Sequence, residues 1–177
     1  MSDDARALKR RAARPPAVVR EILERQTNES AELLEATVGR AFGGDVTNLG
    51  RFVSTLTPVL PAGTKIFLRG SSVTGQSYVS GELFDAHGPG SSDLDIVVSG
   101  DEVMNLFSGD GFYCPRVNSR PLCDTDRDVA PLLDKARSES QALVGRPVSI
   151  QAMAEWFLDL RSAAQQTPVI QLGRVPW

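Results

Sequence analysis

The stretch Asp93-Leu94-Asp95-Ile96-Val97-Val98 sets two aspartates, one residue apart, at the start of an apolar run. A short apolar run predicts a buried β-strand, and side chains alternate between the two faces of a strand. Asp93 and Asp95 are therefore expected on one face, where two carboxylates repel each other unless a cation lies between them. Oxygen-only ligands of this kind suit Mg²⁺, which takes one or two carboxylates together with substrate phosphates.

A second apolar run, Lys65-Ile66-Phe67-Leu68-Arg69, lies upstream and leads into Gly70-Ser71-Ser72. The run predicts a short strand, and the glycine-serine turn after it offers a backbone concavity beside a hydroxyl group, which suits a phosphate. We also expect a short helix over residues 72–79, with its first N–H groups toward the phosphates. Together the two runs predict a site for a Mg²⁺-bound nucleoside triphosphate on two neighbouring strands.

The composition is that of an ordinary globular protein. The chain has 177 residues, of which 41% are hydrophobic and 23% charged, and this length favours one domain. A formal net charge of −3 argues against a protein that coats nucleic acid by bulk charge. Cys114 and Cys123 fit no zinc pattern, so we expect two reduced thiols. No stretch of about 18 apolar residues occurs, so we expect no membrane span and a cytoplasmic location.

The chain is expected to divide into three regions. Residues 1–16 predict a flexible basic arm, residues 17–60 predict the N-terminal helices, and residues 61–177 predict the domain that carries both motifs. Within the helical region, one or two amphipathic helices are expected up to about residue 41. A further helix is expected to begin after Asp45, its N-cap, and to end near residue 59.

Further elements are expected downstream of the aspartates. The expected strands are 94–99, 147–151 and an edge strand at 168–172, and the expected helices are 101–107, 128–144 and 152–164. Asp101 and Asp128 are the expected caps of the first two helices. In the last helix Trp156, Phe157, Leu160 and Ala164 have the spacing of residues that pack inward. Residues 108–127 show little periodicity and predict a long irregular connection.

Together these residues resemble the DNA polymerase β-like nucleotidyltransferase superfamily. It includes DNA polymerase β, the kanamycin-type aminoglycoside nucleotidyltransferases and the minimal nucleotidyltransferases of toxin–antitoxin pairs. The family pattern is a Gly-Ser turn after one strand and Asp-x-Asp on the next. Here the pattern reads Phe67-Leu68-Arg69-Gly70-Ser71-Ser72-Val73-Thr74-Gly75 and Ser91-Ser92-Asp93-Leu94-Asp95-Ile96-Val97-Val98. The resemblance covers residues 64–100 closely, and a third strand by position.

The resemblance implies an α+β (α/β) fold, with a small mixed sheet of roughly three to five strands and helices packed on one face. It implies a transferase that moves a nucleoside monophosphate from a triphosphate, such as ATP, to a hydroxyl acceptor. Asp93 and Asp95 would be the catalytic residues and would hold Mg²⁺, or Mn²⁺ in its place. The residues that would bind the nucleotide phosphates are Arg69, Gly70, Ser71 and Ser72.

The chain departs from the family pattern in two ways. The spacer before Asp93 is longer than usual, and its extra loop, residues 78–90, would be a lid or an element that binds the acceptor. The third carboxylate of the family, a metal ligand and general base, corresponds to Ser149, because Val148 and Ile150 are expected in the core. A carboxylate from elsewhere would have to replace it. The candidates are Asp124, Asp126, Asp128, Glu155 and Asp159, and Tyr78, Phe84 and Tyr113 are candidates for stacking on the base.

Two hypotheses of different kinds follow. The first is an active Mg²⁺-dependent nucleotidyltransferase that acts on a protein, a nucleic acid end or a small molecule. The alternative is a degenerate, non-catalytic domain that binds a nucleotide, RNA or a partner protein as a regulator, as in a toxin–antitoxin pair, and Ser149 motivates it. In either case, minimal members of the family often work beside a small helical protein, so such a partner is a further expectation by resemblance.

Overall fold

A computed structural model describes residues 28–176 of the chain. The predicted basic arm, residues 1–16, and the first part of the helical region, residues 17–27, lie outside the described residues. The helices are α2 (Asn28–Ala41), α3 (Val46–Leu56), α4 (Ser71–Thr74), α5 (Pro131–Val144) and α6 (Glu155–Gln165), with short 3₁₀ turns η2 (Thr57–Val59), η3 (Val103–Leu106) and η4 (Arg127–Val129). The strands are β1 (Lys65–Arg69), β2 (Leu94–Ser99), β3 (Phe112–Cys114), β4 (Asn118–Ser119), β5 (Val148–Ala152) and β6 (Ile170–Arg174).

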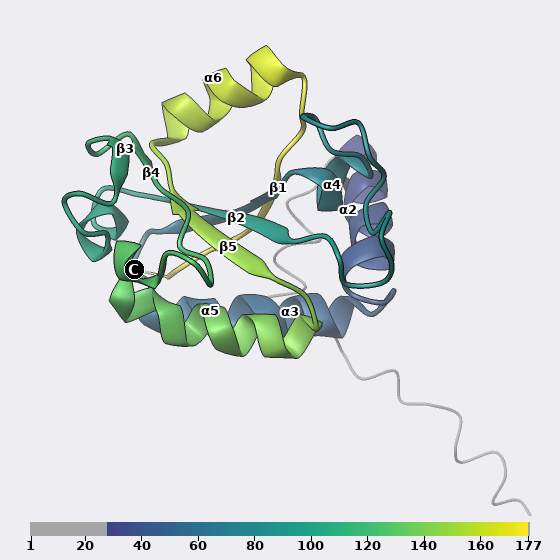
Figure 1. Ribbon diagram of the computed structural model, residues 1–177, viewed down its shortest axis with the longest axis horizontal. Coiled ribbons are helices and arrows are strands. Elements are labelled where there is room, and N and C mark those ends of the chain that lie inside the picture. Colours follow the sequence, from purple (N-terminus) through teal and green to yellow (C-terminus); the bar gives the residue numbers. More distant parts are fainter. Residues whose placement is uncertain (1–27, 177) are drawn as a thin grey trace, which may run out of the picture.

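Four strands form a mixed sheet in the order β5-β2-β1-β6 (Figure 1). β1 pairs antiparallel with both β2 and β6, while β2 and β5 run parallel. A separate two-stranded ladder joins β3 to β4. The predicted class, α+β with a small mixed sheet, is therefore confirmed.

The main core lies between the sheet and the helices α2, α3 and α5. Alternate strand residues face it, among them Leu68, Ile96, Ile150 and Leu172, and all four are buried. α3 contributes Leu49, Phe52, Val53 and Leu56 from one stripe, and the carboxylate of Asp45 caps the helix by accepting a hydrogen bond of 2.8 Å from the Thr47 amide. This face of the sheet carries most of the buried apolar surface, which drives folding.

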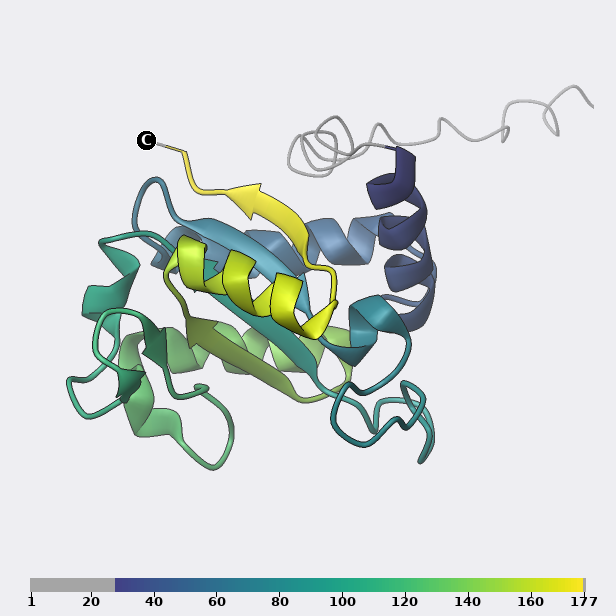
Figure 2. The ribbon, with the colours of Figure 1, turned by 90° about the horizontal axis from the view of Figure 1, so that it is seen from above.

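The opposite face of the sheet is covered by α6, which lies over the strands in Figure 2. Here the structure differs from the expectation that helices pack on one face. A small second cluster joins Leu158 of α6 to Phe67, Val97 and Met153. Of the residues expected to pack inward from α6, Phe157 does pack against this cluster. Trp156 and Leu160 do not, since they are 61% and 59% exposed, whereas Leu158 is 1% exposed.

The other element predictions had mixed outcomes. The strands 65–69 and 94–99 are confirmed. The third strand is shifted by one residue to 148–152, and the edge strand expected at 168–172 is shifted by two residues to 170–174. The helix expected over 72–79 is a single turn that ends at Thr74, because Gly75 follows with a φ of 81°. The expected cap residues Asp101 and Asp128 are not caps, since η3 begins after Glu102 and α5 after Ala130. The segment 108–127, expected to be irregular, contains the β3–β4 ladder. Leu122 of this segment also forms an isolated antiparallel bridge with Ile150 of β5.

Within residues 28–176, no helix is both long enough and apolar enough to cross a membrane. The two cysteines, Cys114 and Cys123, are both free thiols.

Candidate functional site

A row of three side chains crosses the sheet on the face covered by α6. The strand register pairs Arg69 with Asp95, and Asp95 with Ser149. Asp93 lies two residues before Asp95, just ahead of β2. Asp93 and Asp95 line one cavity, at the end of the sheet where β1 ends and β2 begins. The alternation predicted from sequence is thus what brings the two aspartates together, and it also turns Ser149 toward them as expected.

Asp95 is held closely between its neighbours. The Ser149 hydroxyl donates a hydrogen bond of 2.8 Å to Oδ1 of Asp95. On the other side, Gly70 adopts φ 77° and ψ −160°, and a Cβ at this position would lie 2.6 Å from Oδ2 of Asp95. Only glycine fits here, because both the left-handed backbone and the close approach of the carboxylate exclude a side chain.

The pKa of Asp93 is raised from its ordinary value. Partial burial of the carboxylate is the main cause and the negative charge of Asp95 adds to it, while Arg69 opposes both. The residue remains open to solvent at the mouth of the cavity. A cation placed beside Asp93 and Asp95 would stabilise the charged form of Asp93.

Arg69 extends from the end of β1 toward the aspartates. Its Nη2 donates a hydrogen bond of 3.1 Å to Oε1 of Gln151, and its Nε is buried without a partner. Burial lowers the pKa of Arg69, whereas the charge of Asp95 raises it. Gln151 is a site residue that sequence reasoning missed, although its position two residues after Ser149 puts it on the same face of β5.

The two serines of the turn have different surroundings. Ser71 is half-buried and lines the cavity beside Asp93 and Asp95. Ser72 is fully buried, and its hydroxyl donates a hydrogen bond of 3.1 Å to the carbonyl oxygen of Arg69. Ser72 therefore supports the turn, and Ser71 is the serine that can reach a ligand.

The cavity at this end of the sheet has a volume of about 300 Å³. It brings together five of the predicted site residues, and α6 adds Arg161, Ser162 and Gln165 from the opposite wall. Tyr78 also lines it, whereas Phe84 packs under Arg146, with the guanidinium carbon 4.6 Å from the ring centre, and Tyr113 lies exposed on β3. Of the three aromatic candidates, Tyr78 alone lies at this cavity.

Of the proposed replacements for the third carboxylate, only Asp124 borders a hollow with Asp93 and Ser149, of about 190 Å³. The buried Arg137 donates a hydrogen bond of 2.8 Å to one carboxylate oxygen of Asp124, and the partly exposed Gln141 donates one of 2.9 Å to the other. The others lie elsewhere: Glu155 pairs with Lys65, Asp126 pairs with Arg120, and Asp128 and Asp159 are exposed. Within the described residues, no three carboxylate, histidine or cysteine side chains are grouped to hold a metal.

The loop 78–90 is anchored beside the site. Asp85 forms ion pairs with Arg146 at 3.0 and 3.1 Å and accepts hydrogen bonds from the amides of Gly90 and Ser92. The same Arg146 donates to the carbonyl oxygen of Ser92 at 3.3 Å. Ser92, the residue before Asp93, is therefore held by Arg146, which lies two residues before β5. His87 is exposed and lies 3.4 Å from Glu82.

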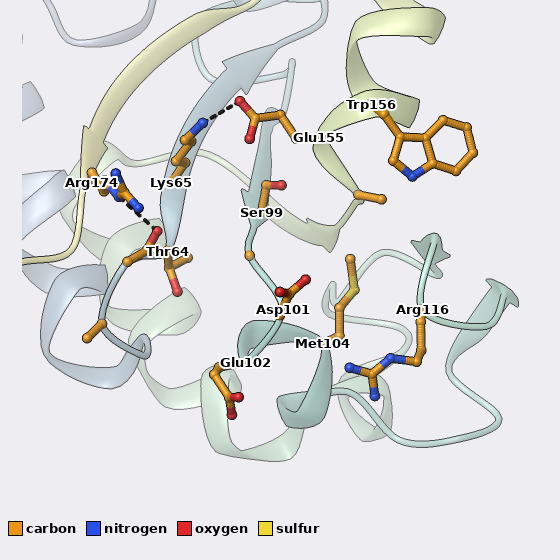
Figure 3. A pocket seen from close by; sticks show the side chains of 14 residues that line it. Thr64, Lys65, Ser99, Asp101, Glu102, Met104, Arg116, Glu155, Trp156 and Arg174 are labelled. Atoms are coloured by element: carbon orange, nitrogen blue, oxygen red, sulfur yellow. Dashed lines mark hydrogen bonds and ion pairs between the residues drawn. The ribbon is translucent and has the colours of Figure 1, made fainter. Parts of the chain in front are cut away.

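A larger cavity of about 700 Å³ lies at the other end of the same sheet face (Figure 3). It is bordered by the start of β1, the end of β2 and the start of α6, and the ion pair of Lys65 with Glu155 crosses it. Charges of both signs are mixed around it, with Asp101 and Glu102 near Arg116. Of the residues proposed from sequence for the site, Glu155 lines this cavity, where it is paired with Lys65.

Comparisons of the chain with protein-family models, with curated proteins and with solved structures found no match. The function is therefore inferred from the residues of the site.

Proposed function

We propose that the protein is a Mg²⁺-dependent nucleotidyltransferase that moves a nucleoside monophosphate from a nucleoside triphosphate to a hydroxyl acceptor. One observation carries the proposal. The turn Arg69-Gly70-Ser71 and the pair Asp93 and Asp95 come from adjacent antiparallel strands and line a single cavity. Groups that bind phosphate and groups that bind a hard cation thus lie side by side, as a metal-bound triphosphate requires.

The donor set fits a hard divalent cation. Asp93 and Asp95 offer only oxygen ligands. The pKa of Asp93 is raised, first by burial and then by the charge of Asp95, and a bound cation would favour its charged form. These two residues would hold Mg²⁺, or Mn²⁺ in its place. When bound, the cation supplies charge neutralisation at the phosphates.

The remaining residues of the site have roles in binding and orientation. Ser71 and the backbone at Gly70 would hold the phosphates, with the free Nε of Arg69 directed to the same anion. In the reaction, the acceptor oxygen bonds to the α-phosphorus while the bond from that phosphorus to the bridging oxygen breaks. Pyrophosphate leaves with the electron pair, and the acceptor proton passes to solvent. Ser149 cannot accept that proton as a carboxylate would, so slow turnover is expected.

The test is calorimetric titration of each nucleoside triphosphate, with Mg²⁺ present and absent, into the wild-type chain and into Asp93→Asn/Asp95→Asn. We expect binding that depends on Mg²⁺ in the wild type and loss of that dependence in the double variant. The exposed pair Asp128→Asn/Asp159→Asn is the matched control for the change in net charge. Equal Mg²⁺-dependent binding by the wild type and Asp93→Asn/Asp95→Asn would overturn the proposal.

A second candidate function has its own observation. The hydrogen bond from Ser149 to Asp95 occupies one carboxylate oxygen and stands where the family has its third carboxylate. This arrangement favours a regulator that binds a nucleotide, RNA or a partner protein without turnover. Ser149→Asp discriminates the two: a non-catalytic domain would bind nucleotide as wild type and gain transfer only with the new carboxylate. A cytoplasmic location and a small helical protein partner suit either function and are proposed with them.

A further inference from the structure

Two arginines line the cavity that holds Asp93 and Asp95. Arg69 reaches it from the end of β1, and Arg161 reaches it from α6, which lies on the other side of the cavity. The cavity therefore presents two cationic groups and two anionic groups to the same small space. Mixed charges of this kind can pair with one another, or they can be arranged for a ligand that itself carries both signs.

The position of Arg161 follows from the packing of α6. Leu158 anchors the helix on Phe67 and Val97 of the sheet. Arg161 lies three residues later, and residues three apart on a helix are neighbours on one face. Its half-buried side chain is thus held on the sheet side of the helix, near the end of the strands.

Arg161 has no ion pair or hydrogen bond with any of residues 28–176 through its side chain. Arg69 has one, to the neutral Gln151. Burial is the main cause of the lowered pKa of Arg69, and the charge of Arg161 lowers it further, while the charges of Asp95 and Asp93 oppose both. Two like charges that face one space are unfavourable unless an anion joins them. A carboxylate partner on the protein would remove this cost, and neither Asp93 nor Asp95 forms an ion pair within 4.0 Å with either arginine, as far as the described residues go.

We propose that Arg161 binds the terminal phosphates of a polyphosphate chain and that this cavity selects its ligand by the length of that chain. The inference rests on the proposed function, because it assigns Arg161 to the part of the triphosphate that leaves as pyrophosphate. Arginine suits the task, since its planar fork can donate two hydrogen bonds to one phosphate.

The size of the cavity supports the same ligand. About 300 Å³ is at the lower end of the range for small-molecule sites, roughly 300–1,000 Å³. Such a space suits the phosphate chain, and the nucleoside then extends past the mouth, where Tyr78 is exposed. Binding of the chain alone should therefore account for much of the affinity.

The experiment titrates inorganic tripolyphosphate, pyrophosphate and orthophosphate into the full chain by calorimetry at constant ionic strength, with and without Mg²⁺. Wild type is compared with Arg161→Gln, with Arg161→Lys and with the control Arg51→Gln, whose arginine is exposed on α3. We expect affinity to rise with chain length in the wild type. Arg161→Gln should weaken tripolyphosphate by about tenfold or more but orthophosphate little, because a charge-assisted hydrogen bond to the terminal phosphate is lost. Arg161→Lys should restore part of the loss, and Arg51→Gln should match the wild type.

The outcomes separate this inference from the proposed function. If Arg161→Gln binds tripolyphosphate as the wild type does, the role of Arg161 is overturned, whatever the titrations with nucleoside triphosphate give. If the chain-length dependence is lost in Arg161→Gln but no transfer is found for the wild type, the polyphosphate site stands and the transferase proposal fails. Absence of binding of any polyphosphate to the wild type, with Mg²⁺ or without, overturns the inference.

Discussion

At the residue scale, Gly70 is the position where a single methyl group would do most harm. A Cβ would lie 2.6 Å from the carboxylate of Asp95, and the φ of 77° is unfavourable for any other residue. We expect Gly70→Ala to lower the free energy of unfolding by about 1–3 kcal/mol and to displace Asp95. Chemical denaturation measures the first effect.

Gly39 offers a control of opposite sign. It lies exposed in α2, and a Cβ there would meet nothing within 4 Å. Gly39→Ala should therefore raise the free energy of unfolding by about 0.5–1 kcal/mol, since alanine is the better helix former. Equal effects of the two substitutions would show that the contact with Asp95 does not constrain the turn.

The raised pKa of Asp93 predicts a pH dependence. The folded state holds the proton of this carboxyl more tightly than the unfolded state, so stability falls as pH rises from the ordinary value of 3.8 through the raised one. Asp93→Asn should remove this loss. The variant should be the more stable protein near pH 7, by a small amount because solvent screens Asp93, and the advantage should disappear below about pH 4. Thermal unfolding of both proteins across this range is the measurement, and an advantage that persists at low pH would contradict it.

How far the sequence predicts the site can be judged residue by residue. Asp93, Asp95 and Ser149 follow from strand alternation, which is a local rule, and the structure turns all three to the same face. Ser72 does not reach the cavity, because the direction of a side chain in a one-turn helix depends on the packing around it. Arg161 lies far along the chain, and only the placement of α6 over the sheet brings it to the aspartates.

At the element scale, α6 shows why periodicity alone mispredicts a helix that covers little surface. Trp156 and Leu160 are exposed apolar residues, and the narrow contact with the sheet is made by Leu158, with Phe157 packed beside it. Leu158→Ala should cost about 2–5 kcal/mol of unfolding free energy, as buried leucine truncations do, whereas Leu160→Ala should change it by less than about 0.5 kcal/mol. Urea titrations of both variants decide this, and a larger loss for Leu160→Ala would restore the inward side expected from the sequence.

The loop 78–90 is expected to depend on one ion pair. Burial alone would raise the pKa of Asp85, but hydrogen bonds from Arg146, Ser92 and Gly90 lower it overall. The stabilisation from this carboxylate is therefore complete above the ordinary value of 3.8 and is lost as pH falls through the lower folded value. Asp85→Asn should remove it at neutral pH.

Hydrogen exchange of the amides of Gly90 and Ser92, which donate to Asp85, reports this directly. Both amides should exchange faster in Asp85→Asn at pH 7, while the amides of β2 keep their protection. His87→Gln, in the same loop but exposed, is the control. Unchanged protection in Asp85→Asn would mean that the rest of the loop suffices to hold it.

At the scale of the whole molecule, the fold is predicted better than the arrangement of its parts. Strands with one apolar face indicate a sheet packed on helices, and the core formed with α2, α3 and α5 agrees with this. The β3–β4 ladder was not predicted, because its strands are very short and its pairing comes from tertiary contacts. The packing of α6 on the second face of the sheet was also not predicted. The polar residues on that face leave room for only a small apolar contact with the helix.

The pairing of β1 has a consequence for synthesis on the ribosome. β1 lies inside the sheet, yet one of its two neighbours is β6, so that Lys65 is paired with Arg174. While residues 170–174 of the nascent chain are still inside the ribosome, the backbone N–H and C=O groups on one side of β1 have no partner strand. An open strand edge of this kind is a template for wrong pairing. Contacts between segments so distant along the chain also form late and slowly. The sheet is therefore complete only after β6 has left the ribosome, and until then the open side of β1 is exposed to wrong pairing.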